Sequence, residues 1–246
     1  MSSPDHEPAG PEQDALERLL DAALAHVPFD GWSPRTLEQA ARDAGIDTLT
    51  LRRLVPGGPA DLVAALHRRV DRQLARELAE VDLSSLRFSE RVAWAVMRRL
   101  ELLAPHREAV RRAAAFLALP QNAPLGARLL WESADTIWRA LGDASDDVNW
   151  YTKRLTLAGV LSAALLYWLG DESPDLADTR AFVARRIEDV MRIERAKDAL
   201  RRSPLGPLWR AGPGRLLERI RPPRAAEAGQ DHRATMPGWV GDGGAG

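Results

Sequence analysis

Apolar residues recur with helical spacing along most of the chain, and no segment alternates between apolar and polar positions long enough to indicate a strand. The most regular pattern is a ladder of apolar residues four positions apart, which starts beside Asp61, a residue suited to cap a helix. Its members are Leu62, Leu66, Val70, Leu74 and Leu78. The pattern predicts an all-α protein with a long helix starting near Asp61.

One stretch, residues 146–169, is polar at its start and then apolar on every side. Between Leu155 and Leu169 the only polar residues are Thr156 and Ser162. This run is too short for a membrane span, which needs ~20 apolar residues. A helix that is apolar all round belongs in the centre of a bundle, against other helices or an apolar ligand. We therefore expect it to be the central helix.

Proline and glycine divide the rest of the chain into further helices. Pro28 is expected to end the first one, while Ser33 and Pro34 have the N-cap and first-turn residues of the second. The expected helices cover 11–27, 34–44, 48–54, 61–78, 89–104, 106–118, 124–141 and 179–202. Helix, short helix, turn and short helix is the outline of a helix-turn-helix.

The chain therefore divides into five predicted parts. Residues 1–11 and 225–246 are expected to be disordered, 12–60 to form a helix-turn-helix-like unit, 61–202 a helical ligand-binding domain, and 203–224 a basic amphipathic segment. The first residues are acidic and lack an apolar stretch, unlike a secretory signal or an Arg-rich mitochondrial presequence. This start predicts a bacterial protein of the cytoplasm.

The charge of the chain is close to balanced, with a formal net charge of −1. A helix that reads DNA needs basic and amide side chains for phosphates and base edges. The helix at 48–54 offers Arg52 and Arg53 but no Asn, Gln or Lys, and arginines barely outnumber acidic residues around it. So small an excess attracts phosphates weakly. We expect no nucleic-acid partner, with DNA binding as the alternative.

Residues that carry chemistry are sparse. The chain has no cysteine, and its five histidines are scattered without metal-ligand spacing. Phosphate-binding, zinc-protease and nucleophile-elbow motifs are also missing. Asp143, Asp146 and Asp147 could bind a metal, but we favour a capping role at the positive end of the central helix. We expect no catalytic residue, metal or cofactor, and hence no enzyme.

Eight tryptophans are present, several on apolar helical faces. They either pack a core or line a cavity for a long apolar ligand, and the pattern alone leaves both open. The candidate cavity residues on these inward faces are Trp94, Met97, Leu100, Phe116, Leu130, Ala134, Ile137, Trp138, Leu161, Leu165 and Trp168.

Two further groups are candidates for contacts with other molecules. Trp150 and Tyr151 adjoin Lys153 and Arg154, and this mixture of aromatic and basic residues suits an interface anchor. The segment at 203–224 combines basic and apolar residues, as expected for docking on an anionic membrane, although it could instead pack back on the body. Its candidates are Leu205, Leu208, Trp209, Arg210, Arg215, Leu216, Leu217, Arg219 and Ile220. Such docking would place the protein peripherally on the inner membrane.

Several motifs resemble one known family. They are the blocks HVPFDGW at 26–32, LALP at 117–120, NWYTKR at 149–154 followed by Leu157 and Ala158, SPD at 173–175 and RRI at 185–187. Together they are similar to the coenzyme Q (ubiquinone) biosynthesis protein nine family, over roughly residues 14–200. The NWYTKR block is the most specific of them.

The resemblance implies a TetR-like fold, which usually forms homodimers. It implies an isoprenoid or phospholipid ligand in the domain at 61–202, and a non-enzymatic role that assists a late hydroxylase of ubiquinone synthesis. The partner-binding patch of the family carries over to Trp150, Tyr151 and Arg154. A TetR-like transcriptional regulator that senses a lipid is the rival interpretation, and a lipid-modifying enzyme is a weaker third.

Overall fold

The structure is a computed structural model that describes residues 10–143 and 148–202, and in these ranges every regular element is a helix. The prediction of an all-α fold is therefore confirmed. The elements are α1 (Pro11–Asp30), α2 (Pro34–Asp43), α3 (Thr48–Leu54), α4 (Pro59–Glu80), α5 (Phe88–Leu103), η1 (Ala104–His106), α6 (Arg107–Leu117), α7 (Ala123–Ala140), α8 (Val148–Gly170), η2 (Pro174–Leu176) and α9 (Ala177–Arg202).

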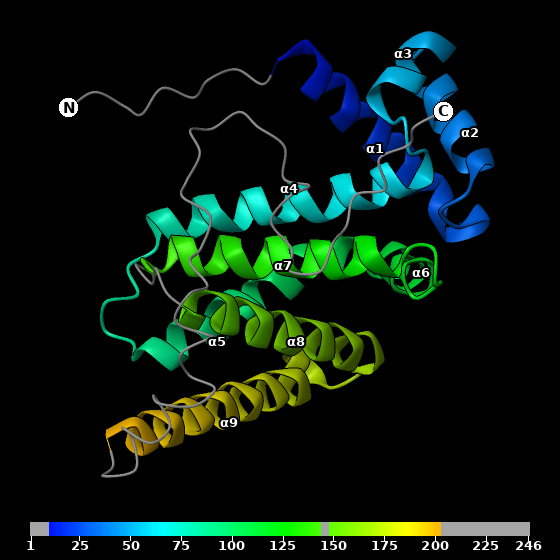
Figure 1. The fold of residues 1–246 in the computed structure, drawn as a ribbon. Helices are drawn as coiled ribbons and strands as arrows, with labels where there is room; N and C mark the ends of the chain where they lie inside the picture. Colours follow the sequence, from blue (N-terminus) through cyan, green and yellow to red (C-terminus); the bar gives the residue numbers. More distant parts are fainter. Residues whose placement is uncertain (1–9, 144–147, 203–246) are drawn as a thin grey trace.

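The helices form layers, with a small N-terminal unit at one end (Figure 1). Helices α4 and α7 pack side by side, α8 packs against α7, and α9 lies beneath α5 and α8. Helices α1 to α3 gather on the N-terminal half of α4. In the described ranges no helix combines the length and apolarity needed to cross a bilayer.

The N-terminal unit has the expected helix-turn-helix outline. Ser33 caps α2 by accepting a hydrogen bond from the amide of Thr36, and Asp47 caps α3 through the amides of Leu49 and Thr50. The unit is tied to the larger body by Trp32, whose indole donates to a backbone carbonyl of α6 at 3.0 Å.

Several predicted helix boundaries differ from the structure by a few residues, and two of these differences have a clear local cause. Helix α1 continues past Pro28 to Asp30, because the proline lies in the last turn, where the amide of Gly31 still bonds the carbonyl of Val27. Helix α4 begins at Pro59 rather than at Asp61, whose carboxylate instead accepts from the amide of Gly57. The apolar ladder that predicted this helix is buried along its whole length.

Helix α8 is not enclosed on all sides, so its predicted place at the centre of the bundle is only partly correct. Leu157, Leu161 and Trp168 are buried against the other helices, but Leu155 is 68% and Leu166 61% exposed. The apolar character of α8 is therefore split between a buried face and an exposed face. Periodicity could not separate them because both faces are apolar.

The end of α8 is held by arginines from α6. Arg107 donates to the carbonyls of Trp168 and Asp171, each at 2.6 Å, and Arg111 donates to that of Leu169 at 2.6 Å. The last carbonyls of a helix lack partners within the helix and carry partial negative charge, which cations stabilise. This contact fixes the C-terminal end of α8 to the body.

A buried polar network joins α4, α5 and α7. Arg99, only 2% exposed, donates to the carboxylate of Asp71 at 2.8 Å and to the hydroxyl of Ser133 at 2.9 Å. Ser133 in turn donates to Asp71 at 2.6 Å. A guanidinium cannot lose its charge in a protein, so its burial requires these partners.

His67 completes the network in its neutral form. Its Nδ1 accepts a hydrogen bond from Arg99 at 3.0 Å, because the guanidinium can only donate. Burial, reinforced by the positive charge of Arg99, lowers the pKa of His67 to about 4. The network therefore contains one cation and one carboxylate at neutral pH.

We expect Arg99→Met to lower the free energy of unfolding by about 3–5 kcal/mol, because it leaves the carboxylate of Asp71 buried without its cation. Urea unfolding would measure the loss. The neighbouring Arg98→Met is the control, since it removes a half-exposed cation paired with Glu77 and should cost about 0–1 kcal/mol. Equal losses for the two variants would contradict the structural role of the buried network.

Candidate ligand cavity and aromatic patch

A cavity of about 400 Å³ lies between α5, α7, α8 and α9. This volume is within the ~300–1,000 Å³ range of small-molecule sites. Most of the wall is apolar, which suits an apolar ligand. It is lined by Phe88, Val92, Trp138, Lys153, Thr156, Leu157, Val160, Ile187, Val190 and Met191.

Part of the cavity wall is aromatic and includes a cation. The rings of Phe88 and Trp138 are stacked with their centroids 5.6 Å apart. The ammonium of Lys153 lies 5.4 Å from the centroid of the Trp138 ring, within the range of a cation–π contact. The indole N–H of Trp138 also donates to the carbonyl of Lys153 at 3.2 Å. These contacts hold α7 and α8 together at the cavity wall.

Of the cavity residues predicted from the sequence, Trp138 is the one that lines this cavity. Six of the others are buried in the core, and the remaining four are half-buried against it. The buried ones are Met97, Leu100, Ala134, Ile137, Leu161 and Trp168, and the half-buried ones are Trp94, Phe116, Leu130 and Leu165. Helical periodicity identifies an inward face, but it does not distinguish tight packing from a gap between helices.

Beside the cavity, three aromatic rings form a cluster, which we call the aromatic patch: Trp131, Trp150 and Tyr151. The centroids of Trp131 and Trp150 are 5.7 Å apart, and those of Trp150 and Tyr151 are 4.8 Å apart. Trp131 is buried, whereas Trp150 and Tyr151 are half-buried and reach the surface. The sequence pattern predicted an aromatic contact surface from Trp150 and Tyr151 alone. In the structure Trp131 of α7 packs against both rings.

Arg154 is not on the surface, contrary to the prediction that it belongs to an exposed patch. Its side chain is 1% exposed, and its guanidinium lies 4.0 Å from the centroid of the Trp150 ring. It donates to Asp135 at 2.6 Å and to Asp143 at 3.2 Å. These two carboxylates supply the partners that a buried cation requires. Arg154 therefore supports the patch from beneath.

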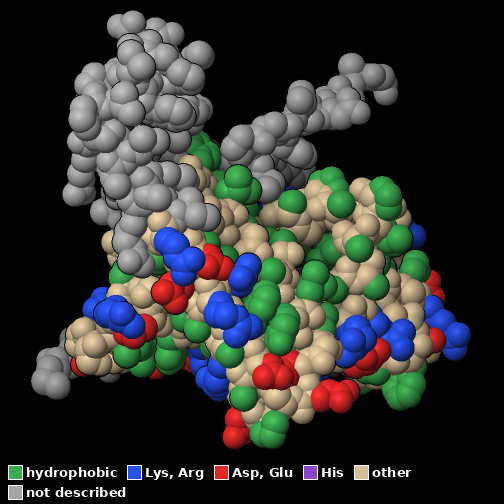
Figure 2. Space-filling model, turned by 90° about the horizontal axis from the view of Figure 1, so that it is seen from below, with side chains coloured by type: hydrophobic (Ala, Val, Ile, Leu, Met, Phe, Trp, Pro, Cys, Tyr) green, Lys and Arg blue, Asp and Glu red, His purple; other side chains and the backbone are tan. Residues whose placement is uncertain are grey.

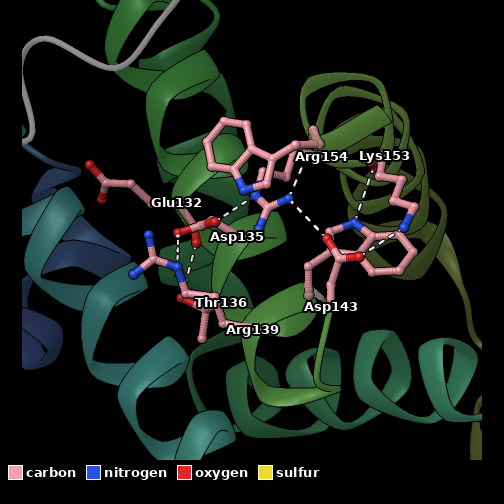
Figure 3. A network of polar contacts seen from close by, with 9 residues as sticks. Glu132, Asp135, Thr136, Arg139, Asp143, Lys153 and Arg154 are labelled. Atoms are coloured by element: carbon pink, nitrogen blue, oxygen red, sulfur yellow. Dashed lines mark hydrogen bonds and ion pairs between the residues drawn. The ribbon is translucent and has the colours of Figure 1, made fainter. Parts of the chain in front are cut away.

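Asp143 is shared by two cations (Figure 3). Its other oxygen accepts from the ammonium of Lys153 at 2.8 Å, so one carboxylate contacts both Lys153 and Arg154. Asp143 is thus an ion-pair centre, while Asp146 and Asp147, its predicted companions, lie outside the described residues. Among the residues that are described, no cluster of three histidine or acidic side chains could hold a metal ion.

The predicted membrane-docking segment, including Leu205 to Ile220, lies outside the described residues, as do residues 1–9 and 225–246. The face on the α9 side of the molecule is visible in Figure 2, where charged side chains of both signs alternate with apolar ones. On α9, Arg186 and Arg192 both pair with Asp189.

We expect Arg154→Met to lower the melting temperature by about 10 °C, because both carboxylates lose a buried partner. Differential scanning calorimetry would measure the shift. Arg139→Met is the matched control: this arginine also pairs with Asp135, at 2.8 Å, but it is 68% exposed and its loss should cost little. An Arg154 variant as stable as the Arg139 variant would show that Arg154 does not support the patch.

Comparison with known proteins identifies relatives across most of the chain. The model of the COQ9 family matches residues 123–194, which include α7, α8 and much of α9. The mitochondrial ubiquinone biosynthesis protein COQ9 of Rattus norvegicus is 33% identical over 186 residues, covering 73% of this chain and 60% of that protein. The proteins of that name from Homo sapiens and Drosophila melanogaster are 32% and 31% identical and are covered over 58% and 61% of their lengths.

A solved structure supports the fold. A TetR transcriptional regulator from Nitrosomonas europaea superposes with a TM-score of 0.56 at 19% identity, covering 71% of this chain and 97% of that one. At this level of identity the likeness concerns the fold alone. It confirms the prediction of a TetR-like bundle with a helix-turn-helix-like unit at its N-terminal end.

The relatives also correct one expectation. They are named as mitochondrial proteins of eukaryotes, so the prediction of a bacterial protein in the cytoplasm, peripheral to the inner membrane, is contradicted. That prediction rested on the composition of the first residues, which does not identify an organism. The resemblance on the NWYTKR block, in contrast, is confirmed. Over 73% of its length the chain is similar to the COQ9 protein of Rattus norvegicus, of which it spans 60%.

Proposed function

We propose that this protein acts in ubiquinone biosynthesis as a non-enzymatic accessory protein, which binds an isoprenoid quinone intermediate and presents it to a membrane-associated hydroxylase. The names of its homologues support a role in that pathway. The observation that carries the proposal is the apolar cavity of about 400 Å³ beside the aromatic patch, largely within the stretch that the family model matches. Transfer of an isoprenoid chain from water into such a cavity is favourable, and the free energy of transfer grows with the apolar area that leaves water.

The rival function, a transcriptional regulator that senses a lipid, draws on the same fold. Helix α3 occupies the position of a DNA-reading helix and exposes Leu49 at 76%, beside Arg52 and Arg53. An exposed leucine offers no hydrogen bond to a phosphate, and Arg53 already faces Glu12 at 4.0 Å. These features favour the lipid-binding accessory function, and we propose no nucleic-acid partner.

For the hydroxylase we propose the aromatic patch as the contact surface. Half-buried aromatic rings are rigid and present a large area at little entropic cost, as in the anchors of many interfaces. Trp150 and Tyr151 are half-buried and precede Lys153, which lines the cavity, in the first turns of α8. A partner docked there would lie next to the bound lipid.

The exposed face of α8 suits a second copy of the chain. Leu155 and Leu166 are exposed at either end, and a Cβ added to Gly159 between them would meet open space. A two-fold axis across this face would place each Leu155 against Leu166 of the other copy, with the small residue where the helices cross. We propose a homodimer through this face, and docking of the segment at 203–224 on an anionic membrane.

We expect Val160→Phe to reduce co-purified lipid severalfold, because this buried side chain lines the cavity and the added ring would fill it. Native mass spectrometry of the purified protein would measure the bound fraction and identify the lipid. Leu155→Phe, on the exposed face of the same helix, should leave it unchanged. Equal amounts of co-purified lipid in the two variants would show that the lipid does not bind in this cavity.

Trp150→Ala should weaken hydroxylase binding by about 2 kcal/mol, the cost of losing an aromatic anchor. Calorimetric titration would measure the affinity, and a melting curve would give the folded fraction because Trp150 also packs on Trp131. Phe29→Ala removes an aromatic side chain that is 82% exposed elsewhere on the molecule and should have no effect. If hydroxylase binding falls only in proportion to the folded fraction, the aromatic patch is not the surface that contacts the hydroxylase.

Leu166→Glu should convert the proposed homodimer to monomer, because it buries a charge without a partner in the interface. Sedimentation velocity would distinguish the two states. Leu119→Glu introduces the same charge at another exposed apolar position, 44% exposed, and should leave the dimer intact. Dimers that persist in the Leu166 variant would move the interface away from α8.

A further inference from the structure

His67 is a titratable side chain that is buried where α4, α5 and α7 meet, and we call its group of four, His67, Asp71, Arg99 and Ser133, the buried network. Each of these residues is 6% exposed or less. Asp71 of α4 accepts from Arg99 of α5 at 2.8 Å and from Ser133 of α7 at 2.6 Å. Arg99 also donates to Ser133 at 2.9 Å. The three helices are therefore joined at this point by polar contacts that lie away from water.

Protonation of His67 conflicts with the hydrogen bonds of the buried network. The Nδ1 atom accepts from Arg99 at 3.0 Å, and a guanidinium has no acceptor with which to reverse that bond. A protonated imidazole carries an N–H on both ring nitrogens. Two donors, each on a positively charged group, would then face each other where water screens their repulsion poorly. Asp71 balances one of these positive charges but not both.

The other charged groups around α4 are engaged with one another. Helices α1, α5 and α7 all pack on α4, and in the described ion pairs their charged side chains meet charges of α4. The charged residues of α2, which also touches α4, are exposed. The charges that act on the imidazole are thus those of its own network. The pairs around it are Glu17 and Asp21 with Arg69, Glu132 with Arg68, and Arg98 with Glu77.

We propose that the buried network is a proton-sensitive switch: when His67 gains a proton, α5 separates from α4 and α7. This inference does not depend on the proposed function. Once the network opens, α5 is tied to α4 by Arg98 and Glu77 and to α9 by Arg180 and Glu101, pairs that water screens. Because α5 forms one side of the cavity, the network also holds that side in place.

The pH range of the switch follows from the direction in which the pKa is shifted. Burial is the main cause that lowers the pKa of His67 to about 4, the charge of Arg99 acts in the same direction, and the charge of Asp71 opposes both. In the opened state the side chain binds a proton at its ordinary pKa of 6.5. The stability that neutral His67 contributes is therefore complete above that pKa and is lost as the pH falls from 6.5 toward 4. Between pH 7 and pH 5 the equilibrium constant for closing the network should fall about twentyfold.

Urea unfolding of the full chain at pH 7 and pH 5 tests whether His67 senses the proton. His67→Asn keeps an oxygen near the place of Nδ1 that can accept from Arg99, but it does not titrate. The folding equilibrium constant of the unaltered protein should fall about twentyfold more between the two pH values than that of the variant. Burial also lowers the pKa of His106, but His106 is present in both proteins and its effect cancels. His26→Asn is the matched control, because His26 pairs with Asp43 near the surface, and it should keep the full fall.

Hydrogen exchange followed by mass spectrometry tests the separation of α5 and needs no variant. After correction for the intrinsic effect of pH, the protection of the α5 amides should fall about twentyfold between pH 7 and pH 5. Helix α1 also packs on α4 but contributes none of the four residues of the network, so it is the internal control. Its protection should fall less than that of α5.

Two results would overturn the inference. An equal pH dependence of the unaltered and the His67→Asn proteins would show that another group senses the proton. An equal loss of protection in α5 and α1 would show that acid loosens the whole fold instead of releasing α5. A steep fall that His67→Asn removes and His26→Asn keeps, together with the larger loss of protection in α5, would support both parts of the proposal.

Discussion

The architecture depends on one constraint: a buried arginine must keep its anionic partners, since it cannot shed its charge. Arg99 and Arg154 are both almost inaccessible to water, and both find partners on or next to α7. Two residues of α7 make these contacts: Ser133 bonds to Asp71 in the network with α4 and α5, and Asp135 pairs with Arg154 of α8. Helix α7 thus connects the layers on either side of it. The cavity and the aromatic patch lie where the second of these networks ends.

The regulator-like fold does not by itself indicate what the protein does. The helix-turn-helix-like unit and the bundle are shared with a TetR regulator, yet a fold does not by itself set a function. The features on which the proposed function rests are local: an apolar cavity whose wall includes Phe88 and Trp138, and the half-buried rings of the aromatic patch. Both fall largely within the region matched by the COQ9 family.

The elements of the fold could be predicted from the sequence because each rests on local signals. The ladder ending at Leu78 and the caps at Ser33 and Asp47 depend on residues only a few positions apart. The burial of Arg154 could not be predicted, because its partners lie far from it along the chain and an arginine beside a tryptophan also suits a surface. The cavity was missed for a related reason, since a gap between helices depends on how they pack. Trp131 enters the patch only through the pairing of α7 with α8.

The arginines of α6 at the end of α8 have a mechanical consequence. Arg107 and Arg111 hold the carbonyls of Trp168 and Leu169, so the C-terminal end of α8 is fixed to α6. Arg154 lies at the other end, ~21 Å away at ~1.5 Å per residue. A tilt of α8 by only ~3° about this fixed end would move the position of Arg154 by ~1 Å. A change of that size in the donor–acceptor distance is enough to break a hydrogen bond. The ion pairs of Arg154 with Asp135 and Asp143 therefore leave little room for α8 to tilt about the end that α6 holds.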